Sequence, residues 1–253
     1  MTDSAVRIAL VTGGSEGIGR CIAEMLQADG FTTVVMARRE GPLGAMAAQG
    51  HLVFQGDVSD AEAIDRVITE IGRRFGKMDA LVHCAGIVES EPAAALSLGS
   101  IARQVQINLV GTMLVNRAAL PLLVRCRGAI VNFSSGIVRR PIAGTAVYAA
   151  TKAGVEAFSR SLAFEVGVSG VRVNVVSPTL VRSKIWVSAG MPQQTYDRIH
   201  AERGAEYPLG RAGEPEDVAE LVCFLVSQGA GWITGAVIPV DGGSTLGAVQ
   251  RGT

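Results

Sequence analysis

Short runs of apolar residues alternate along the chain with longer stretches in which apolar residues recur every three or four positions. Uninterrupted apolar runs bounded by turn residues are typical of strands buried on both faces of a parallel sheet. Seven such runs occur, at residues 7–11, 32–36, 51–55, 80–84, 129–133, 171–176 and 236–240. Helical patterns lie between them at 17–29, 61–75, 101–125 and 148–166, and a further helix begins near 215. This alternation predicts an α/β fold, a doubly wound parallel sheet of seven strands with helices on both faces, in one domain covering residues 1–253.

Local signals refine three of these elements. Gly111 and Pro121 are expected to interrupt the 101–125 helix. Ser59 and Glu62 fit a capping box that opens the 61–75 helix, which leaves the Asp57 carboxylate free to accept from an adenine amino group. Between residues 179 and 210 the alternation is lost, as in many lids, and we expect this segment to face the substrate. A pair of helices packed on the core is the alternative for that segment.

Composition narrows the class of protein. Lys and Arg total 23 and so do Asp and Glu, so the balanced charge favours neither nucleic acid nor anionic lipid as a partner. No apolar run reaches the roughly 18 residues of a membrane span, and the N-terminus lacks the regions of a signal peptide. The four cysteines and three histidines have no metal-ligand spacing. We therefore expect a cytoplasmic protein with reduced thiols and no metal site.

A glycine-rich turn, Thr12-Gly13-Gly14-Ser15-Glu16-Gly17-Ile18-Gly19, joins the first predicted strand to the first predicted helix. Glycines at 13, 17 and 19 allow a tight turn and let a phosphate approach the free N–H groups at the helix N-terminus. The context of strand, glycine turn, helix and second strand predicts a nucleotide-binding site.

The end of the second strand bears on the choice of cofactor. It reads Ala37-Arg38-Arg39, with no carboxylate to accept from a ribose 2′-OH, and arginine suits a 2′-phosphate. Glu16 in the glycine-rich turn could repel that phosphate, and a solvated arginine pair is the structural alternative. The sequence favours NADP(H) and leaves NAD(H) open.

Tyr148 and Lys152 are four residues apart in a helical pattern, so they share a face. A nearby cation favours the phenolate and lowers the pKa of a tyrosine, which would suit the pair to general acid/base chemistry. Ser134-Ser135-Gly136 follows the fifth strand, where open α/β sheets bind ligands. Asn108 lies in an apolar helical stretch, where its amide either caps a local kink or holds a water.

Taken together, these motifs resemble the short-chain dehydrogenase/reductase family, of the single-domain kind, over nearly the whole chain. The matching pieces, whose order and spacing are specific, are Thr12-Gly13-x-x-x-Gly17-Ile18-Gly19, Asp57-Val58, Ala85-Gly86, Asn108, Ser135, Tyr148-x-x-x-Lys152, Asn174-x-Val176-x-Pro178 and Asp241-Gly242-Gly243. The resemblance implies a Rossmann-type fold, hydride transfer between a nicotinamide cofactor and a carbonyl or alcohol, and a homodimer or homotetramer.

The resemblance also implies residue roles. Tyr148 is the acid/base, Lys152 lowers its pKa and holds the nicotinamide ribose, Ser135 binds the substrate oxygen, and Asn108 holds a water that connects Lys152 to solvent. The implied cofactor-binding residues are Gly13, Ser15, Gly17, Ile18, Gly19, Arg38, Arg39, Asp57, Val58, Ala85, Gly86, Tyr148, Lys152, Pro178, Val181 and Ser183. The chain departs from the usual family pattern at His83-Cys84, in place of two asparagines, and at Thr179, in place of glycine.

These features favour an NADPH-dependent reductase of a ketone, either 3-oxoacyl reductase-like with a free, carrier-bound or CoA-bound substrate, or acting on a small cyclic or sugar ketone. An NAD-dependent alcohol dehydrogenase of the same fold is one alternative. A non-catalytic nucleotide-binding regulator is another, against which the complete set of Asn108, Ser135, Tyr148 and Lys152 argues. An anion-binding role for Arg139 and Arg140 and a solvated charge pair both stay open.

Overall fold

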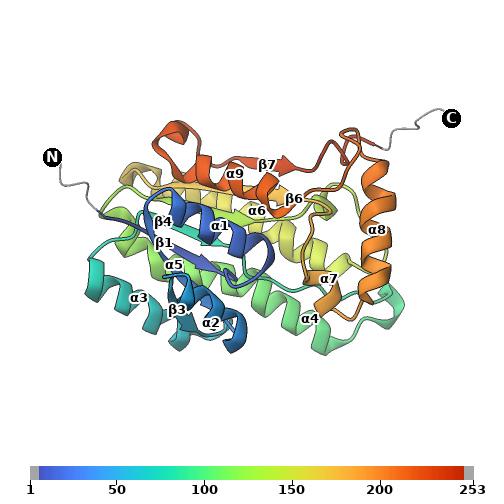
Figure 1. Cartoon of the computed structure of the whole chain (residues 1–253), viewed down its shortest axis with the longest axis horizontal. Coiled ribbons are helices and arrows are strands. Elements are labelled where there is room, and N and C mark those ends of the chain that lie inside the picture. Colours follow the sequence, from blue (N-terminus) through green and yellow to red (C-terminus); the bar gives the residue numbers. More distant parts are fainter. Residues whose placement is uncertain (1–5, 248–253) are drawn as a thin grey trace.

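The computed structural model describes residues 6–247 and contains one parallel sheet of seven strands in the order β3-β2-β1-β4-β5-β6-β7. Its strands are β1 (Arg7–Thr12), β2 (Phe31–Ala37), β3 (Leu52–Gln55), β4 (Ala80–His83), β5 (Ala129–Phe133), β6 (Arg172–Pro178) and β7 (Val237–Val240). The order places β1 and β4 side by side at the centre, the point where the winding direction of the sheet reverses (Figure 1). This topology confirms the predicted single-domain, doubly wound fold.

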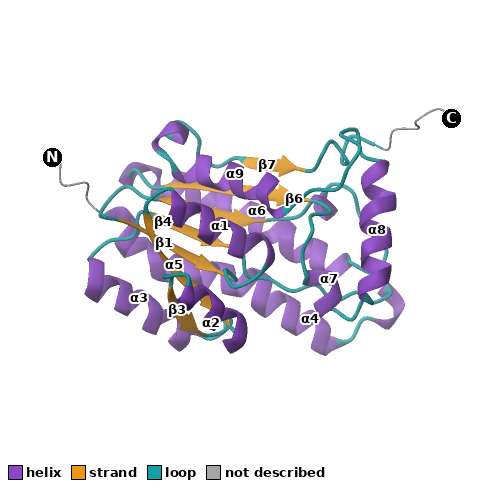
Figure 2. Cartoon of the chain, in the orientation of Figure 1, coloured by secondary structure: helices purple, strands orange, loops and turns teal. Residues whose placement is uncertain are grey.

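Helices cover both faces of the sheet, as Figure 2 shows. They are α1 (Gly17–Ala28), α2 (Glu40–Ala48), α3 (Ala61–Phe75), α4 (Leu98–Gln104), α5 (Gly111–Val124), α6 (Ala146–Val166), α7 (Ile185–Ser188), α8 (Gln193–Ala205) and α9 (Pro215–Val226). Successive strand residues point to opposite faces, so Ile8 and Leu10 pack with α3, α5 and α6, whereas Ala9 and Val11 pack with α1, α2 and α9. The two apolar layers explain why the strands are apolar throughout.

Helix α2 has no counterpart in the elements predicted from the sequence. Two glycines and Pro42 conceal its helical pattern, but the proline lies in the first turn, where no intrahelical N–H bond is lost. Leu43 and Met46 are buried against the sheet and hold α2 in place.

The predicted capping box at Ser59 is wrong. Asp60 caps α3, and its Oδ1 accepts from the backbone N–H groups of Glu62 (2.9 Å) and Ala63 (3.2 Å). The Ser59 hydroxyl donates instead to Asp57 Oδ1 at 2.8 Å, so it is not available as a cap. Asp57 is consequently fixed by its own turn as well as facing the ligand cavity described below.

The expected interruptions at Gly111 and Pro121 are also wrong, because one helical stretch continues through Leu98–Val124. Its irregular part is instead a π-helical turn at Val105–Val110, and Pro121 is tolerated with its ring on the exposed side. By length and composition alone this stretch could cross a membrane, and 44% of its most apolar window is buried. Val115, Ala119 and Leu123 belong to the core beneath the sheet, which accounts for the hydropathy.

The segment from 179 to 210 contains α7 and α8, rather than irregular backbone. Tyr196 and His200 of α8 are buried, and the Tyr196 hydroxyl donates to Val181 O at 3.1 Å. Both helices lie beyond the carboxyl ends of the strands, at the right of Figure 1. The segment therefore covers the sheet edge at which α/β folds bind ligands, and lid motion of it stays a prediction.

Candidate active site

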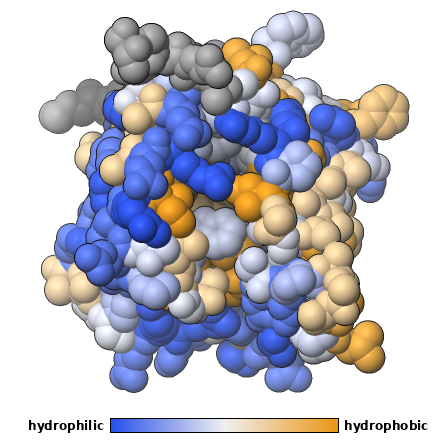
Figure 3. Space-filling view, turned by 90° about the vertical axis from the view of Figure 1, so that its right-hand side faces the viewer, coloured by the Kyte–Doolittle hydropathy of each residue, from blue (hydrophilic) through white to orange (hydrophobic). Residues whose placement is uncertain are grey.

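A cavity of about 1010 Å³ opens along the carboxyl ends of the strands. The loops after β1, β2, β3, β4, β5 and β6 line one side of it, and α7 with part of α8 lines the other. Figure 3 shows apolar side chains inside the hollow on this face and many hydrophilic side chains around it. An apolar cavity with a few polar groups converging on it is the usual form of a small-molecule site.

Helix α6 places Tyr148 and Lys152 one turn apart, and both side chains are buried at the cavity. The Lys152 ammonium donates to the carbonyl of Phe133 at 2.9 Å and lies 5.7 Å from the centre of the Tyr148 ring. Ser135 follows β5, and its hydroxyl is near enough to the Tyr148 phenol to lower the pKa of that phenol. By contrast, the neighbouring Ser134 hydroxyl donates to Glu156 Oε1 at 2.7 Å. The geometry thus brings together Ser135, rather than Ser134, with the tyrosine and the lysine.

Burial dominates the titration of this pair. It raises the pKa of Tyr148 to about 12, with the Ser135 hydroxyl lowering it in part. It also lowers the pKa of Lys152 to about 8. Loss of water around the phenolate thus dominates the pKa of Tyr148, and the expected lowering of that pKa by Lys152 stays a prediction. The phenol is held in its protonated form at neutral pH, which is the form that can donate to an alkoxide.

Asn108 is fully buried within the π-helical turn and, unlike the other predicted site residues, does not line the cavity. Its Oδ1 accepts from Ile87 N at 2.8 Å, and its Nδ2 donates to Ile87 O at 2.9 Å. A second donor contact reaches Thr151 Oγ1 at 3.3 Å. Asn108 thus fastens the loop after β4 to α6. A role in holding a water for Lys152 stays a prediction.

The glycine-rich turn packs against the loop after β4. Gly13 has φ 67°, and a Cβ there would lie 2.8 Å from the backbone N and Cα of Ala85. A Cβ on Gly19 would overlap the carbonyl oxygen of Gly13. Only glycine fits these positions, and the backbone they free forms a cradle at the start of α1 that suits a pyrophosphate.

Charged residues gather at the end of the cavity beyond β2. Arg38 Nη1 lies 3.6 Å from Asp57 Oδ2, and Arg39 forms an ion pair with Glu16. Glu16 also accepts from Lys184 Nζ at 3.1 Å, a contact that spans from the glycine-rich turn to the 179–210 segment. Three cations thus surround two carboxylates, so the negative charge of Glu16 is compensated and the region keeps a positive excess.

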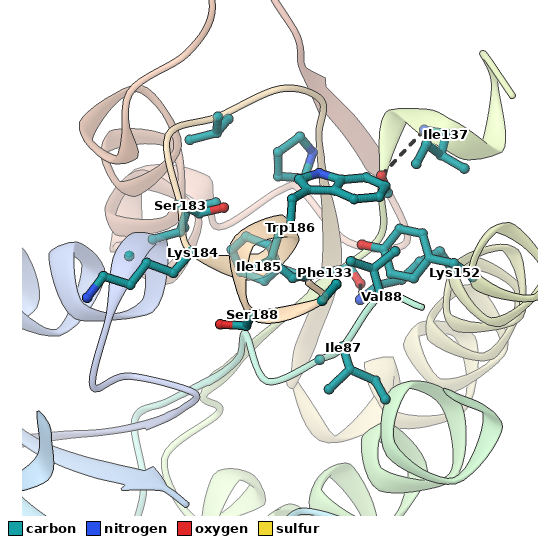
Figure 4. Close-up of a pocket in the computed structure, with 18 of the residues that line it drawn as sticks. Ile87, Val88, Phe133, Ile137, Lys152, Ser183, Lys184, Ile185, Trp186 and Ser188 are labelled. Atoms are coloured by element: carbon teal, nitrogen blue, oxygen red, sulfur yellow. Dashed lines mark hydrogen bonds between the residues drawn. The ribbon is translucent and has the colours of Figure 1, made fainter. Parts of the chain in front are cut away.

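The other predicted cofactor-binding residues also line the cavity, namely Ser15, Gly17, Ile18, Val58, Ala85, Gly86, Pro178, Val181 and Ser183. Opposite the cofactor cradle, Val88, Ile137 and Tyr148 form a small buried apolar cluster on which Ile185 and Trp186 pack. In Figure 4 the indole of Trp186 extends across the cavity toward Ile137. This apolar part is the space left for a substrate.

Comparison with known proteins agrees with this geometry. A family model described as "Enoyl-(Acyl carrier protein) reductase" matches residues 13–245. The canine protein named (3R)-3-hydroxyacyl-CoA dehydrogenase is 34% identical, over 93% of this chain and 95% of the relative. A cis-4-hydroxycyclohexanecarboxylate dehydrogenase from Sinomonas cyclohexanicum is 36% identical, over 95% and 97%. The chain belongs to the short-chain dehydrogenase/reductase family.

The fold of a solved member of this family agrees as well. Aldohexose dehydrogenase from Thermoplasma acidophilum, in its ligand-free form, superposes with a TM-score of 0.89 at 28% identity, covering 100% of this chain and 99% of that one. As a family member, this protein is an oxidoreductase of alcohol and carbonyl groups that uses NAD(P)(H). The glycine cradle and the charged end of the cavity fit such a dinucleotide. Family membership also argues against a non-catalytic regulator.

The two departures from the usual family pattern have local structural counterparts. His83 is buried, its Nδ1 lies 2.9 Å from Thr12 Oγ1 on the adjacent strand β1, and burial lowers its pKa to about 3. The imidazole is therefore neutral and ties the two central strands together. Thr179 lies against Gly136, where its Cγ2 methyl occupies the position that a Cβ on Gly136 would take.

Sequence reasoning did not single out Val88 and Ser244, which line the cavity, and it placed Lys184 there only as part of the 179–210 segment. Lys184 is recognisable only through its contact with Glu16, which is 168 positions away in the chain. Arg139 and Arg140 are adjacent in the sequence, but their side chains have different surroundings. Arg140 lines the cavity, whereas Arg139 donates to Ser177 Oγ at 3.2 Å and lies 3.7 Å from Glu156.

Proposed function

We propose that this protein is an NADPH-dependent reductase of ketones. The observation that carries the proposal is the charge at the end of β2, where Arg38 and Arg39 line the cavity and Ala37 offers no carboxylate to a ribose 2′-OH. Arginine is well matched to a phosphate because its N–H groups form charge-assisted, bidentate hydrogen bonds. The pairing of Glu16 with Arg39 and Lys184 removes the repulsion that the sequence alone suggested.

The reaction follows from the placement of the hydroxyl groups. When bound, NADPH would supply the hydride that is added to the carbonyl carbon, and the oxidised cofactor would be released as NADP⁺. The Ser135 and Tyr148 hydroxyls donate hydrogen bonds to the carbonyl oxygen, which stabilises the developing negative charge. Tyr148 then gives its proton to that oxygen, which completes the secondary alcohol, and its raised pKa keeps the proton in place until then. Lys152 lies beside the phenol. It passes a proton from solvent back to the Tyr148 oxygen.

The substrate is a 3-oxoacyl compound, free or bound to CoA or a carrier protein, or a small cyclic or sugar ketone. The apolar surface formed by Val88, Ile137 and Trp186 suits a hydrocarbon body next to the carbonyl. Relatives of this chain are named for hydroxyacyl-CoA and for hydroxycyclohexanecarboxylate, which supports both types of substrate. NAD-dependent oxidation of an alcohol is the second candidate, because relatives of this chain are named as dehydrogenases of hydroxy compounds.

Cofactor binding tests the proposal directly. Trp186 lines the cavity, whereas Trp232 is 99% exposed, so in a Trp232→Phe protein the tryptophan fluorescence reports on the cavity. We expect NADPH to bind roughly 10- to 100-fold more tightly than NADH, as charge-assisted hydrogen bonds imply. Arg38→Ala and Arg39→Ala should remove most of that difference, and Arg117→Ala, an exposed arginine on α5, should not. Tighter binding of NADH would refute the proposal in favour of the second candidate.

We further propose that the protein is cytoplasmic and forms a homodimer or homotetramer that binds neither nucleic acid nor membrane. The four cysteines are free thiols, as expected in a reducing compartment. Phe164 on α6 and the adjoining Val168 are 88% and 94% exposed, and large exposed apolar residues favour association between subunits. Light scattering after size exclusion would give the subunit number, and a mass of one chain would contradict the proposal.

A further inference from the structure

Arg140, one of the charged residues that line the cavity, is held by hydrogen bonds of both its side chain and its backbone. Its guanidinium Nη1 donates to the carbonyl of Ser244 at 2.8 Å, and its own backbone N–H donates to Gly136 O at 2.8 Å. Two segments therefore hold it, the turn that carries Ser135 and the chain after β7. An arginine fixed in this way presents its remaining N–H groups to a ligand with little loss of side-chain entropy.

No ion pair within the described residues neutralises Arg140. Among residues 6–247, no carboxylate oxygen lies within 4 Å of its guanidinium nitrogens. Asp241, three positions before Ser244, accepts instead from Gly243 and Thr245. Of the other charged residues on the substrate side, Arg103 is paired with Glu89, and Arg203 and Glu206 contribute opposite charges. Among residues 6–247, Arg140 thus carries a charge that no carboxylate pairs with, as does the buried Lys152, whose ammonium donates to Phe133 O.

Ser244 adds a second polar group at the same place. It is 1% exposed, it lines the cavity, and its hydroxyl has no hydrogen-bond partner among the described residues. A buried hydroxyl without a partner is unfavourable, and such groups are rare in folded proteins. An oxygen acceptor bound by Arg140 would give this hydroxyl a partner after a rotation of its side chain.

We infer that Arg140, with Ser244, binds a carboxylate of the substrate, so that the ketones this enzyme reduces are oxo acids. The inference rests on the proposed function and specifies its substrate class. The backbone N–H of Arg140 donates to the carbonyl of Gly136, the residue after Ser135, so Ser135 and Arg140 lie at the two ends of one turn. We therefore expect the carbonyl and the carboxylate to belong to one small molecule. The phosphates of a CoA or carrier thioester lie beyond the whole pantetheine arm, so they do not fit this spacing.

Three ketones, of which the first two share the same reactive group, test the inference by following NADPH oxidation. They are 4-oxocyclohexanecarboxylate, its neutral methyl ester and acetoacetyl-CoA. We expect the wild-type kcat/KM to be roughly 10- to 100-fold higher for the acid than for the ester, the range expected for a hydrogen-bonded charge. Arg140→Gln should bring the ratio of acid to ester close to one, mainly through a higher KM for the acid. Arg140→Lys keeps the charge and should retain part of the preference.

Arg117→Gln, which removes the same charge from an exposed site on α5, should leave the ratio unchanged. Thermal unfolding and NADPH binding show whether each variant is folded. An ester reduced as well as the acid by the wild type would overturn the inference and leave the proposed function intact. Preference for acetoacetyl-CoA over both would also overturn it, as would loss of acid preference in Arg203→Gln but not in Arg140→Gln. Failure to reduce any of the three would overturn the proposed function, and the inference with it.

Discussion

Gly136 and Thr179 face each other across the floor of the cavity, and their contact makes a sharp prediction about stability. Gly136 follows Ser135, is buried and has no positive φ, so its backbone would accept an alanine without strain. The obstacle is the side chain of Thr179, since a Cβ on Gly136 would overlap its Cγ2 methyl. The next nearest atoms are Thr179 Cβ at 3.4 Å and Pro178 O at 3.6 Å, both in ordinary contact.

Gly136→Ala should therefore destabilise the protein through a single methyl group. Overpacking of a buried site costs about 1–3 kcal/mol. Thr179 cannot avoid the clash freely, because a β-branched side chain has few χ1 rotamers and its hydroxyl lies 3.5 Å from Asp241 O. At about 2–4 °C per kcal/mol for a chain of this size, the thermal midpoint should fall by roughly 2–12 °C.

A double-mutant cycle isolates the contact. Thr179→Ser removes Cγ2 and keeps the hydroxyl, at a cost of about 1 kcal/mol for the lost methyl. In this background Gly136→Ala should cost almost nothing, so the two substitutions should couple by about 1–3 kcal/mol. Circular dichroism during thermal unfolding of the four proteins measures the cycle. Equal destabilisation by Gly136→Ala in both backgrounds, or none in either, would refute the reasoning.

Three further predictions concern titration and catalysis. Tyr148→Phe should lower kcat for ketone reduction by roughly 10²–10⁴ while NADPH binding in a fluorescence titration is retained, and a loss below tenfold would exclude Tyr148 as the proton donor. Because burial lowers the pKa of Lys152 from 10.5 to about 8, its ammonium is present below that pH, so reduction rates should fall as the pH rises through about 8, and a flat profile up to pH 9.5 would contradict this role. Burial also lowers the pKa of His83 from 6.5 to about 3, so between these values the unfolded chain binds the extra proton. The free energy of unfolding from urea titrations should thus fall on acidification by up to about 1.4 kcal/mol per pH unit from this residue, more steeply than in His83→Asn, and identical slopes would argue against a buried neutral imidazole.

Local patterns in the sequence were sufficient to predict the fold and most of the residues that line the cavity. Each strand is an apolar run of its own, and β-strands buried on both faces need no distant partner to be recognised. The glycine-rich turn and the Tyr148–Lys152 pair are likewise defined by spacing within one element. For that reason the predicted cofactor residues do line a common cavity in the structure.

The cap of α3 and the existence of α2 were harder to predict from the sequence. Asp60 caps α3 rather than Ser59 because the Ser59 hydroxyl is already bound to Asp57. Helix α2 formed despite its glycines and proline because Leu43 and Met46 could be buried. A competing local hydrogen bond decided the cap, whereas tertiary burial outweighed local propensity in α2.

By itself the sequence determined the order of the elements, the glycine cradle and the candidate reacting groups, since each depends on residues close together along the chain. Only the tertiary structure decided how those groups behave. Burial at the cavity raises the pKa of Tyr148. The pairing of Glu16 with Lys184, 168 positions away, and of Arg140 with Ser244, 104 positions away, distinguishes compensated charges from free ones. Such contacts depend on how the elements pack, and hydrophobic periodicity carries no information about them.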